Sequence, residues 1–370
     1  MDLAQLQERS RVIRAVRSFF DRRGYLEVDT PLLSPDLIPE TCLEVFETLR
    51  IPAPALRGGI KKGEPYWLVP SPEIWMKRLI ARHRVSMYQI CKCFRNGESS
   101  GRLHSPEFTM LEYYTMDADY LDSLKLTEEL FAALPENPAA PPFLRVTVEE
   151  AFSRWAGIDL YGAAEEGPRG SARTLAEAAR RLGLEPPPDL DTPALYDLIF
   201  IHAVEPALPR DRPVALTDYP AFVPCLAKKG RDRRTVERWE LYVNGVELAN
   251  CYSEETEPEA VRRYFEAETA AKNRKALVPH RVDPRYWELF LPKKNAAGIN
   301  TFAAGINTFA AGINTFAAGI DTFAAAVNGE PPSFPRCSGV AMGLDRLIMA
   351  LTGRKTIDGV LPFPMEERLF

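Results

Sequence analysis

The segment from Met87 to Tyr114, MYQICKCFRNGESSGRLHSPEFTMLEYY, constrains the fold more than any other part of the chain. It contains two runs with a period of two residues around a loop rich in Gly, Ser and Pro, which predicts an antiparallel hairpin. One face of the first strand carries Gln89, Cys91, Cys93 and Arg95, and one face of the second carries Phe108, Met110, Glu112 and Tyr114. If the two faces coincide, an arginine that can bind phosphate or carboxylate, a ring that can stack on a base and a carboxylate that can hold an ammonium share one side. The pattern alone is more typical of a half-buried hairpin with an ordinary ion pair.

A second hairpin is predicted at WELYVNGVELAN, because Asn244-Gly245 between two strand-like runs is the strongest short hairpin signal. A two-residue turn pairs Tyr242 with Glu247 and Glu240 with Ala249, so the two glutamates become diagonal neighbours on one face. Carboxylates this close repel each other unless a cation lies between them. Mg²⁺ that carries ATP phosphates commonly takes one or two protein carboxylates. The alternative is two solvated glutamates on an exposed face.

Composition narrows the class of protein. The chain has 370 residues, 46% of them hydrophobic, which suits one large domain or two ordinary ones. A net charge of −5 argues against a broad phosphate-binding surface. We expect no signal peptide, because residues 1–11 are charged and continue into an amphipathic helix, and no run is apolar and long enough to span a membrane. Six cysteines without a CxxC pair predict reduced thiols in a cytoplasmic protein.

Four segments resemble class II aminoacyl-tRNA synthetases of the lysyl type. FRN, a loop and H-x-P-E-F-T-M-L-E resemble motif 2; RRGYLEVDTPLL, with Pro31, resembles motif 1, which forms a homodimer interface in that family. E-L-x-x-x-G-x-E-x-x-N at 240–250 is similar to the lysyl-type signature, and CSGVAMGLDRLIMAL at 337–351 resembles motif 3. The resemblance covers most of the chain. It implies an α+β class II synthetase catalytic fold over residues 1–370, with an antiparallel sheet flanked by helices and a mostly helical insertion at 117–210.

The resemblance also implies a site for ATP and Mg²⁺. Arg95 and Arg346 take the catalytic roles: Arg95 bridges the α-phosphate and the substrate carboxylate, while Arg346 covers adenine opposite Phe108 and reaches the γ-phosphate. Glu240 and Glu247 are the implied metal ligands. The remaining ATP-binding positions are Asn96, Gly97, Glu98, His104, Ser105, Leu241 and Gly343. Related enzymes have a glutamate two positions after the arginine, where this chain has Gly97 followed by Glu98.

An amino-acid pocket for lysine or β-lysine is implied by the same family. Glu73 contacts the substrate amine, Glu112 and Tyr114 line the side-chain pocket, and Asn250 and Glu254 match positions that bind the carboxylate and the side-chain amine. The other implied substrate-binding residues are Ser71, Pro72, Glu247 and Ala341. Strict alternation would turn Asn250 and Glu254 to the opposite face from Glu247. We therefore predict a bulge or twist between Glu247 and Asn250.

Two features point to a particular branch of this family. A full lysyl-tRNA synthetase has an N-terminal OB-fold that binds the anticodon, whereas this chain starts at the catalytic helix, so we expect no anticodon-binding domain. Ala341 occupies a position that is glycine in lysyl-tRNA synthetases, and one methyl group is worth about 1–3 kcal/mol of discrimination. Both features resemble the truncated paralogues that activate (R)-β-lysine or lysine as an adenylate and transfer it to a lysine side chain of elongation factor P.

Two alternatives remain at this point. One is a stand-alone lysyl-transferase that acts on tRNA or another acceptor. The other is an inactive regulatory paralogue that binds only nucleotide or lysine; Arg95, Glu240, Glu247 and Arg346 argue against it.

A tandem repeat is the most unusual segment. AAGINTF occurs at 296–302, 303–309 and 310–316, and AAGIDTF follows at 317–323. The Ile and Phe positions would form a narrow apolar stripe on a helix, but each unit carries a glycine and β-branched residues that weaken a helix. We interpret 296–323 as an expansion of a connecting segment without a catalytic purpose; a coiled-coil role is the alternative.

Overall fold

The computed structural model describes residues 2–51, 63–97, 102–135, 137, 139–164, 167–292 and 334–364. Glu98 and the 296–323 repeat lie outside these residues. None of the helices in the described part of the chain combines the length and apolar character needed to cross a membrane. All six cysteines are free, as predicted, and the Cys91 and Cys93 sulfurs are 3.9 Å apart.

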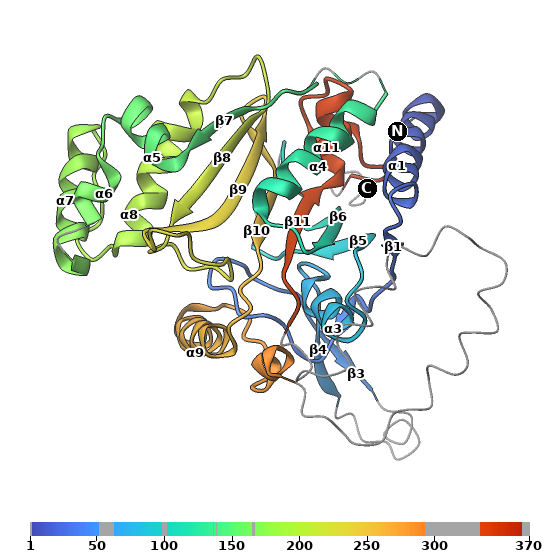
Figure 1. The fold of residues 1–370 in the computed structure, drawn as a ribbon, viewed down its shortest axis with the longest axis horizontal. Helices are drawn as coiled ribbons and strands as arrows, with labels where there is room; N and C mark the ends of the chain where they lie inside the picture. The colour runs from blue at the N-terminus through green and yellow to red at the C-terminus, as the bar shows by residue number, and fades with distance from the viewer. Residues whose placement is uncertain are drawn as a thin grey trace.

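A mixed eight-stranded sheet forms the centre of the molecule (Figure 1). In spatial order its strands are β1 (Leu26–Glu27), β5 (Met87–Phe94), β6 (Glu107–Met116), β11 (Cys337–Gly343), β10 (Val246–Ser253), β9 (Thr235–Val243), β8 (Val214–Pro220) and β7 (Leu144–Thr147). The expected antiparallel sheet is correct for the six inner strands and wrong at both edges, where β1 runs parallel to β5 and β7 parallel to β8. Parallel neighbours need long crossover connections, and both edge pairs have them.

One face of the sheet is apolar and is covered by α1 (Leu3–Asp21), α4 (Tyr120–Ala133) and α11 (Leu344–Leu351) (Figure 1). Alternate strand residues such as Leu111, Val340 and Leu241 point into this core. The α1 helix begins at a capping box, in which Asp2 and Gln5 each accept the other's backbone N–H at 2.9 Å. The amphipathic helix expected at the start of the chain is confirmed, and Gly24 follows it in the left-handed region at φ +73°.

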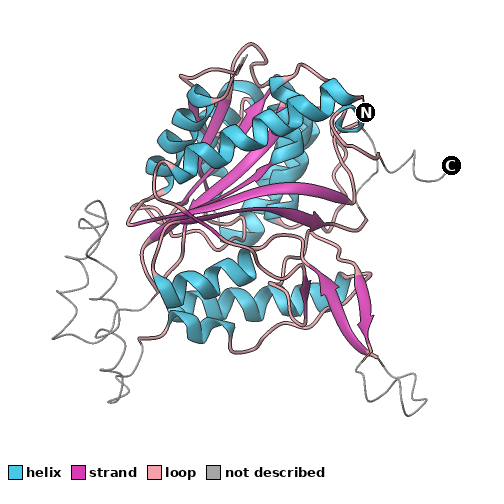
Figure 2. Cartoon of the chain, turned by 90° about the vertical axis from the view of Figure 1, so that its right-hand side faces the viewer, coloured by secondary structure: helices cyan, strands magenta, loops and turns pink. Residues whose placement is uncertain are grey.

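The opposite face is polar at its centre, and we call it the site face. Below it lie α3 (Glu73–His83), α9 (Pro258–Lys275), a 3-10 turn at Tyr286–Phe290 and a small sheet of β2 (Leu33–Ser34), β4 (Glu64–Leu68) and β3 (Glu47–Arg50) (Figure 2). The α9 helix begins at Pro258, because proline suits the first helical position.

The 117–210 segment is mostly helical and also contributes to the main fold. Its α4 packs on the central sheet and its β7 forms the sheet edge. The remaining elements pack against β7 and β8 and lie on the left of Figure 1. They are α5 (Val148–Ala151), a π-helical turn at Phe152–Ala156, α6 (Leu160–Ala164), α7 (Gly167–Arg181), α8 (Thr192–Ile199), a second π-helical turn at Phe200–Val204 and a 3-10 turn at Glu205–Ala207.

Candidate active site

Five side chains from five neighbouring strands form one row across the site face. The cross-strand pairs are Gln89–Glu112, Glu112–Ala341, Ala341–Asn250 and Asn250–Glu240. Paired residues in a sheet point to the same face, so the predicted coincidence of the two faces of the first hairpin is confirmed. We call these five residues the site row.

A β-bulge brings Asn250 into the site row. The turn at Asn244-Gly245 has φ values of 55° and 75°, as a type I′ turn requires, and it pairs Tyr242 with Glu247 as predicted. The register then shifts between Glu247 and Ala249, so Glu240 pairs with Asn250. The predicted Glu240–Ala249 pair is therefore wrong, whereas the predicted bulge between Glu247 and Asn250 is confirmed. The extra residue places Glu247 and Asn250 on one face.

A buried ion-pair cluster lies beside the site row. The Lys77 ammonium is 2.6 Å from Glu73 Oε1 and 2.6 Å from Glu254 Oε2. The side chains of Lys77 and Glu254 are each 1% exposed. Burial alone would lower the pKa of Lys77, but the two carboxylates outweigh it and raise that pKa well above its usual range. Lys77 is therefore a fixed internal cation between two of the predicted substrate-binding glutamates.

Glu112 is the buried carboxyl at the centre of the pocket. Its Oε2 accepts the Ser71 hydroxyl at 2.6 Å and its Oε1 accepts the Tyr114 hydroxyl at 2.9 Å. Burial, together with the nearby charge of Glu73, raises the pKa of Glu112 to about 8, although both hydrogen bonds and Lys77 oppose the rise. The structure thus brings together Ser71, Glu73, Glu112, Tyr114 and Glu254.

Gly339 on β11 makes room for this pocket. A Cβ atom at this position would lie 2.5 Å from Tyr114 Cε1 and 2.7 Å from Glu254 Oε1. Both distances are far below van der Waals contact. Only glycine therefore allows these two pocket residues to approach the strand between them.

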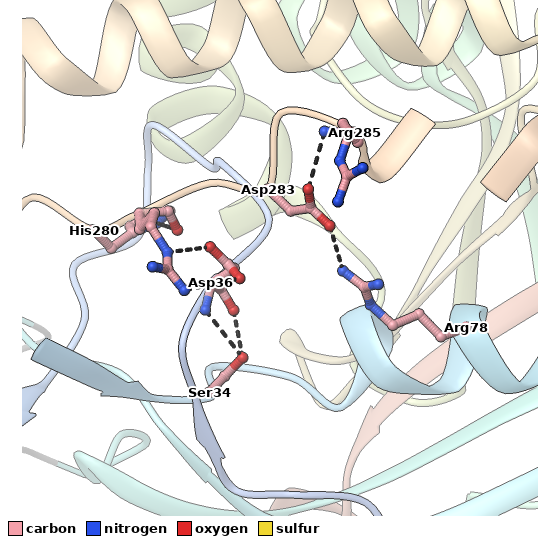
Figure 3. A network of polar contacts seen from close by, with 7 residues as sticks. Ser34, Asp36, Arg78, His280, Asp283 and Arg285 are labelled. Atoms are coloured by element: carbon pink, nitrogen blue, oxygen red, sulfur yellow. Dashed lines mark hydrogen bonds and ion pairs between the residues drawn. The ribbon is translucent and has the colours of Figure 1, made fainter. Parts of the chain in front are cut away.

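The start of α3 places Ser71 beside Glu73. Pro72 is the N-cap of the helix, and the Ser71 hydroxyl accepts the Glu73 backbone N–H at 3.1 Å. The polar network in Figure 3 anchors the exposed side of this helix: Arg78 Nη2 is 2.8 Å from Asp283 Oδ2, and the Arg285 backbone N–H donates to Asp283 Oδ1 at 3.0 Å. These contacts tie α3, which carries Glu73 and Lys77, to the segment before the 3-10 turn at Tyr286–Phe290.

The predicted nucleotide-binding residues gather at the other end of the hairpin. The Arg95 guanidinium carbon lies 5.2 Å from the centroid of the half-buried Phe108 ring. Ser105 is buried, and His104 is half-buried. Asp345 Oδ2 accepts the Thr109 backbone N–H at 2.6 Å, so the first turn of α11 adjoins the residue after Phe108.

Arg346 connects the strand that carries Glu247 to the loop that carries Leu103 and His104. Its Nη1 donates to the Glu247 carbonyl at 2.7 Å, its Nε donates to the Leu103 carbonyl at 3.3 Å, and its Nη2 is 3.4 Å from the His104 ring nitrogens. Gly343 is the N-cap of α11, immediately before this turn. The structure therefore brings together Arg346, His104 and the strand that carries Glu247.

Glu240 and Glu247 are close enough to influence each other. Burial and the charge of Glu240 raise the pKa of Glu247, while Arg346, Arg95 and Arg238 oppose the rise. Glu240 Oε1 is 2.5 Å from Arg238 Nη2, and Glu240 Oε2 accepts the Tyr219 and Tyr242 hydroxyls, each at 2.6 Å. Each carboxylate oxygen has two lone pairs, so Oε1 retains one for a cation.

The chemistry of this pair fits Mg²⁺ that receives its other ligands from phosphate and water. Among the described residues, no group of three or more His, Cys, Asp or Glu side chains could hold a metal ion.

At three predicted ATP-binding positions, the side chain is buried in the core or contacts the protein backbone, or the residue is a glycine. Leu241 is fully buried in the apolar core on the far side of the sheet, so only its backbone could contact a ligand. The Asn96 amide donates to the Val45 carbonyl at 3.2 Å and accepts the Gly97 backbone N–H at 2.9 Å. Gly97 has φ +72°. Asn96 and Gly97 thus shape the end of β5, and Glu98 lies outside the described residues.

Sequence reasoning missed three residues beside the pocket. Lys77 lies one helical turn after Glu73, a spacing that could have suggested their ion pair. The Tyr252 hydroxyl is 3.4 Å from Glu73 Oε1, and its position between Asn250 and Glu254 on the strand was a second signal. Glu40 had no signal: Lys272 donates to its carbonyl at 3.0 Å, and burial and Glu73 raise the pKa of the Glu40 carboxyl to about 7.

Comparisons with known proteins identify the family. The family model "tRNA synthetases class II (D, K and N)" matches residues 3–282 and 321–367. An elongation factor P–(R)-β-lysine ligase from Avibacterium paragallinarum is 33% identical over 363 residues, which cover 98% of this chain and 95% of the relative. A protein of the same description from Vibrio parahaemolyticus serotype O3:K6 is 34% identical over 367 residues, 98% of this chain and 96% of the relative. The chain therefore belongs to the class II (D, K and N) tRNA synthetase family, and within it to the family of elongation factor P–(R)-β-lysine ligases.

Proposed function

We propose that this protein activates (R)-β-lysine, or lysine, with ATP and transfers it to a lysine side chain of elongation factor P. The observation that carries the proposal is the site row. It places Glu112 and Asn250 on either side of Ala341, with the buried Glu73–Lys77–Glu254 cluster on one flank and the Arg95–Phe108 pair on the other. A pocket with this many carboxylates suits a substrate with two ammonium groups.

The first step joins the amino acid to AMP. An oxygen of the substrate carboxylate attacks the α-phosphorus of ATP, a new P–O bond forms, and the bond to the pyrophosphate oxygen breaks. Arg95 would neutralise charge that develops on the α-phosphate, and its guanidinium fork suits two oxygen atoms at once. Phe108 would stack on adenine, and Arg346 would lie on the side of the γ-phosphate.

Glu240 and Glu247 are the residues that would hold Mg²⁺. When bound, the ion would neutralise phosphate charge as the pyrophosphate leaves. Burial and the nearby charge of Glu240 together raise the pKa of Glu247, and this proximity of two carboxylates supports the assignment.

The second step forms the protein modification. The ε-amine of an acceptor lysine attacks the acyl carbon, a C–N bond forms, AMP leaves with the C–O bond electrons, and the amine releases a proton. Because the acceptor is a translation factor, the reaction would take place in the cytoplasm.

Ala341 is the proposed selector between the two lysine isomers. Its β-carbon lies in the site row between the carboxyl of Glu112 and the amide of Asn250. A methyl group in a closed pocket changes relative affinities by about 1–3 kcal/mol, which is sufficient to favour an amine one carbon further along the chain.

A homodimer through the motif 1 segment is part of the same proposal. Exposed apolar side chains on α1 and β1 support it: Leu3 is 70%, Leu6 41% and Leu26 53% exposed. Light scattering of the purified protein would measure its mass in solution.

Amino-acid-dependent ATP–pyrophosphate exchange, followed by transfer of labelled amino acid, tests the function. We expect exchange with (R)-β-lysine, weaker exchange with lysine, and label on elongation factor P. Label on tRNA instead would identify a lysyl-transferase. Nucleotide binding without any exchange would identify an inactive regulatory paralogue.

A further inference from the structure

Arg238 on β9 has no role in the reaction as described so far. Its side chain is 16% exposed and lies at the Glu240 end of the site row, on the side of the 117–210 segment. We propose that Arg238 is a positioning residue for the amino acid, which holds the side-chain amide of Asn250 with its NH₂ group turned toward the substrate carboxylate. This inference rests on the proposed function, since it concerns the amino-acid half of the same site.

The contacts of Arg238 form a connected chain. Its Nε donates to Asn250 Oδ1 at 3.2 Å, and its Nη2 is 2.5 Å from Glu240 Oε1. Its guanidinium carbon lies 4.5 Å from the centroid of the Tyr219 ring. The Tyr219 hydroxyl in turn donates to Glu240 Oε2 at 2.6 Å. An ion pair and an aromatic ring therefore fix the guanidinium in place.

Arginine determines which way the amide points. A guanidinium has five N–H donors and no acceptor, so the atom of Asn250 that faces it must be the carbonyl oxygen. The amide nitrogen then points away from Arg238. Within the described part of the chain, no acceptor forms a hydrogen bond with that nitrogen. It is thus a donor on the site face, suited to a carboxylate oxygen.

The neighbour of Asn250 on the opposite strand, Ala341, cannot orient the Asn250 amide. Asn250 pairs with Ala341 on β11, which has no polar side-chain atom. Without Arg238, the amide could rotate and present its oxygen to the substrate, where two oxygens would repel. The planar fork of arginine reaches Glu240 and Asn250 together, which a single lysine ammonium cannot do in the same geometry.

A double-mutant cycle measures whether Arg238 acts through Asn250. The variants are Arg238→Met, Asn250→Ala and their combination, with Arg145→Met as a control that removes an arginine with 47% side-chain exposure from β7. Binding of (R)-β-lysine and lysine is measured by calorimetry without ATP. We expect about tenfold weaker binding in each single variant, as the loss of one hydrogen bond to a charged group implies, and no further loss in the double variant. The control should bind like the wild type.

A purely structural role would give a different result. Arg238→Met would then weaken binding in the Asn250→Ala background by the same factor as in the wild type, and additive losses of this kind overturn the inference. If Arg238→Met does not fold, Arg238→Lys provides the same test with the charge retained: we expect a smaller loss that again disappears in the Asn250→Ala background. If the wild type binds the amino acids and the losses in the variants are additive, only the inference about Arg238 is contradicted. If the wild type binds neither amino acid, the proposed function is contradicted as well.

Discussion

The pocket residues carry more negative charge than a folded interior normally tolerates. Lys77 forms ion pairs with both Glu73 and Glu254, whereas among the described residues the direct partners of the Glu112 carboxyl are the hydroxyls of Ser71 and Tyr114. A buried carboxyl without an ion-pair partner keeps its proton to a higher pH. The free protein therefore holds a neutral Glu112 that a substrate ammonium would ionise, so binding should release a proton.

This protonation makes stability depend on pH in a defined direction. The pKa of Glu112 is about 8 in the folded protein against 4.5 ordinarily. Between these values the folded state binds more protons than the unfolded state, so the free energy of unfolding decreases as pH rises and levels off above about 8. We predict that Glu112→Gln flattens this decrease, measured by urea unfolding from pH 5 to pH 9. Glu47→Gln, on the exposed strand β3, should keep the wild-type slope. An unchanged slope in Glu112→Gln would contradict the buried neutral carboxyl.

A Cβ atom at Gly339 would meet two of the predicted substrate-binding residues, Tyr114 and Glu254, at once. We predict that Gly339→Ala weakens amino-acid binding at least tenfold, because its Cβ would displace the Tyr114 ring and Glu254. Overpacking of this kind also costs about 1–3 kcal/mol of stability. Calorimetry with lysine, together with urea unfolding, measures both effects. Binding equal to wild type would show that Tyr114 and Glu254 do not need this close approach.

At the scale of elements, α1 supports the first turn of α11. Arg9 Nη1 lies 2.6 Å from Asp345 Oδ1, Arg9 Nη2 donates to Thr109 Oγ1 at 3.0 Å, and the two charged side chains are 11% and 2% exposed. Asp345 also accepts the Thr109 backbone N–H. A helix at the start of the chain thus helps to hold the turn that carries Arg346.

Removal of one partner of a buried ion pair leaves the other charge uncompensated, which costs about 3–5 kcal/mol. We predict a loss of this size for Arg9→Met, with a raised KM for ATP because the α11 turn shifts. Arg17→Met removes an exposed ion pair with Glu27, 44% and 40% exposed, and should change stability by less than about 1 kcal/mol. Urea unfolding and pyrophosphate exchange measure the two variants. Equal effects of both substitutions would argue against a supporting role for α1.

Elements with strong local signals could be predicted from the sequence. The two hairpins and the strand–helix unit of β11 and α11 follow from period and turn residues. The bulge before Asn250 follows from the roles that the family resemblance implies for Asn250 and Glu254, combined with strand alternation. The edge strands β1 and β7 could not, because their parallel pairing depends on crossovers that local pattern does not reveal. The start of α9 at Pro258 is also not evident from charge pattern, because the charged run begins at Glu254, which is buried against Lys77 before the helix.

At the scale of the whole molecule, the site depends on strands that are far apart in sequence. The row from Gln89 to Glu240 crosses five strands of one sheet, with helices packed on its apolar face and α3 on its polar face. Motif resemblance identified most members of the row, since each motif is local. The contact of Arg238 with Asn250 depends on the bulged register of one hairpin, and the contact of Lys272 with the Glu40 carbonyl depends on tertiary packing; neither had a sequence signal.

In the proposed mechanism the amino acid and ATP react on the site row, with Arg95 beside Phe108 at the α-phosphate. Pyrophosphate exchange with (R)-β-lysine, measured in the wild type and in Arg95→Ala, is the decisive experiment for this role of Arg95. The account predicts exchange in the wild type and a loss of at least about 10³-fold in the variant, in the range seen when a preorganised charge donor is removed, while the variant remains folded by circular dichroism. Exchange retained in Arg95→Ala would contradict the account.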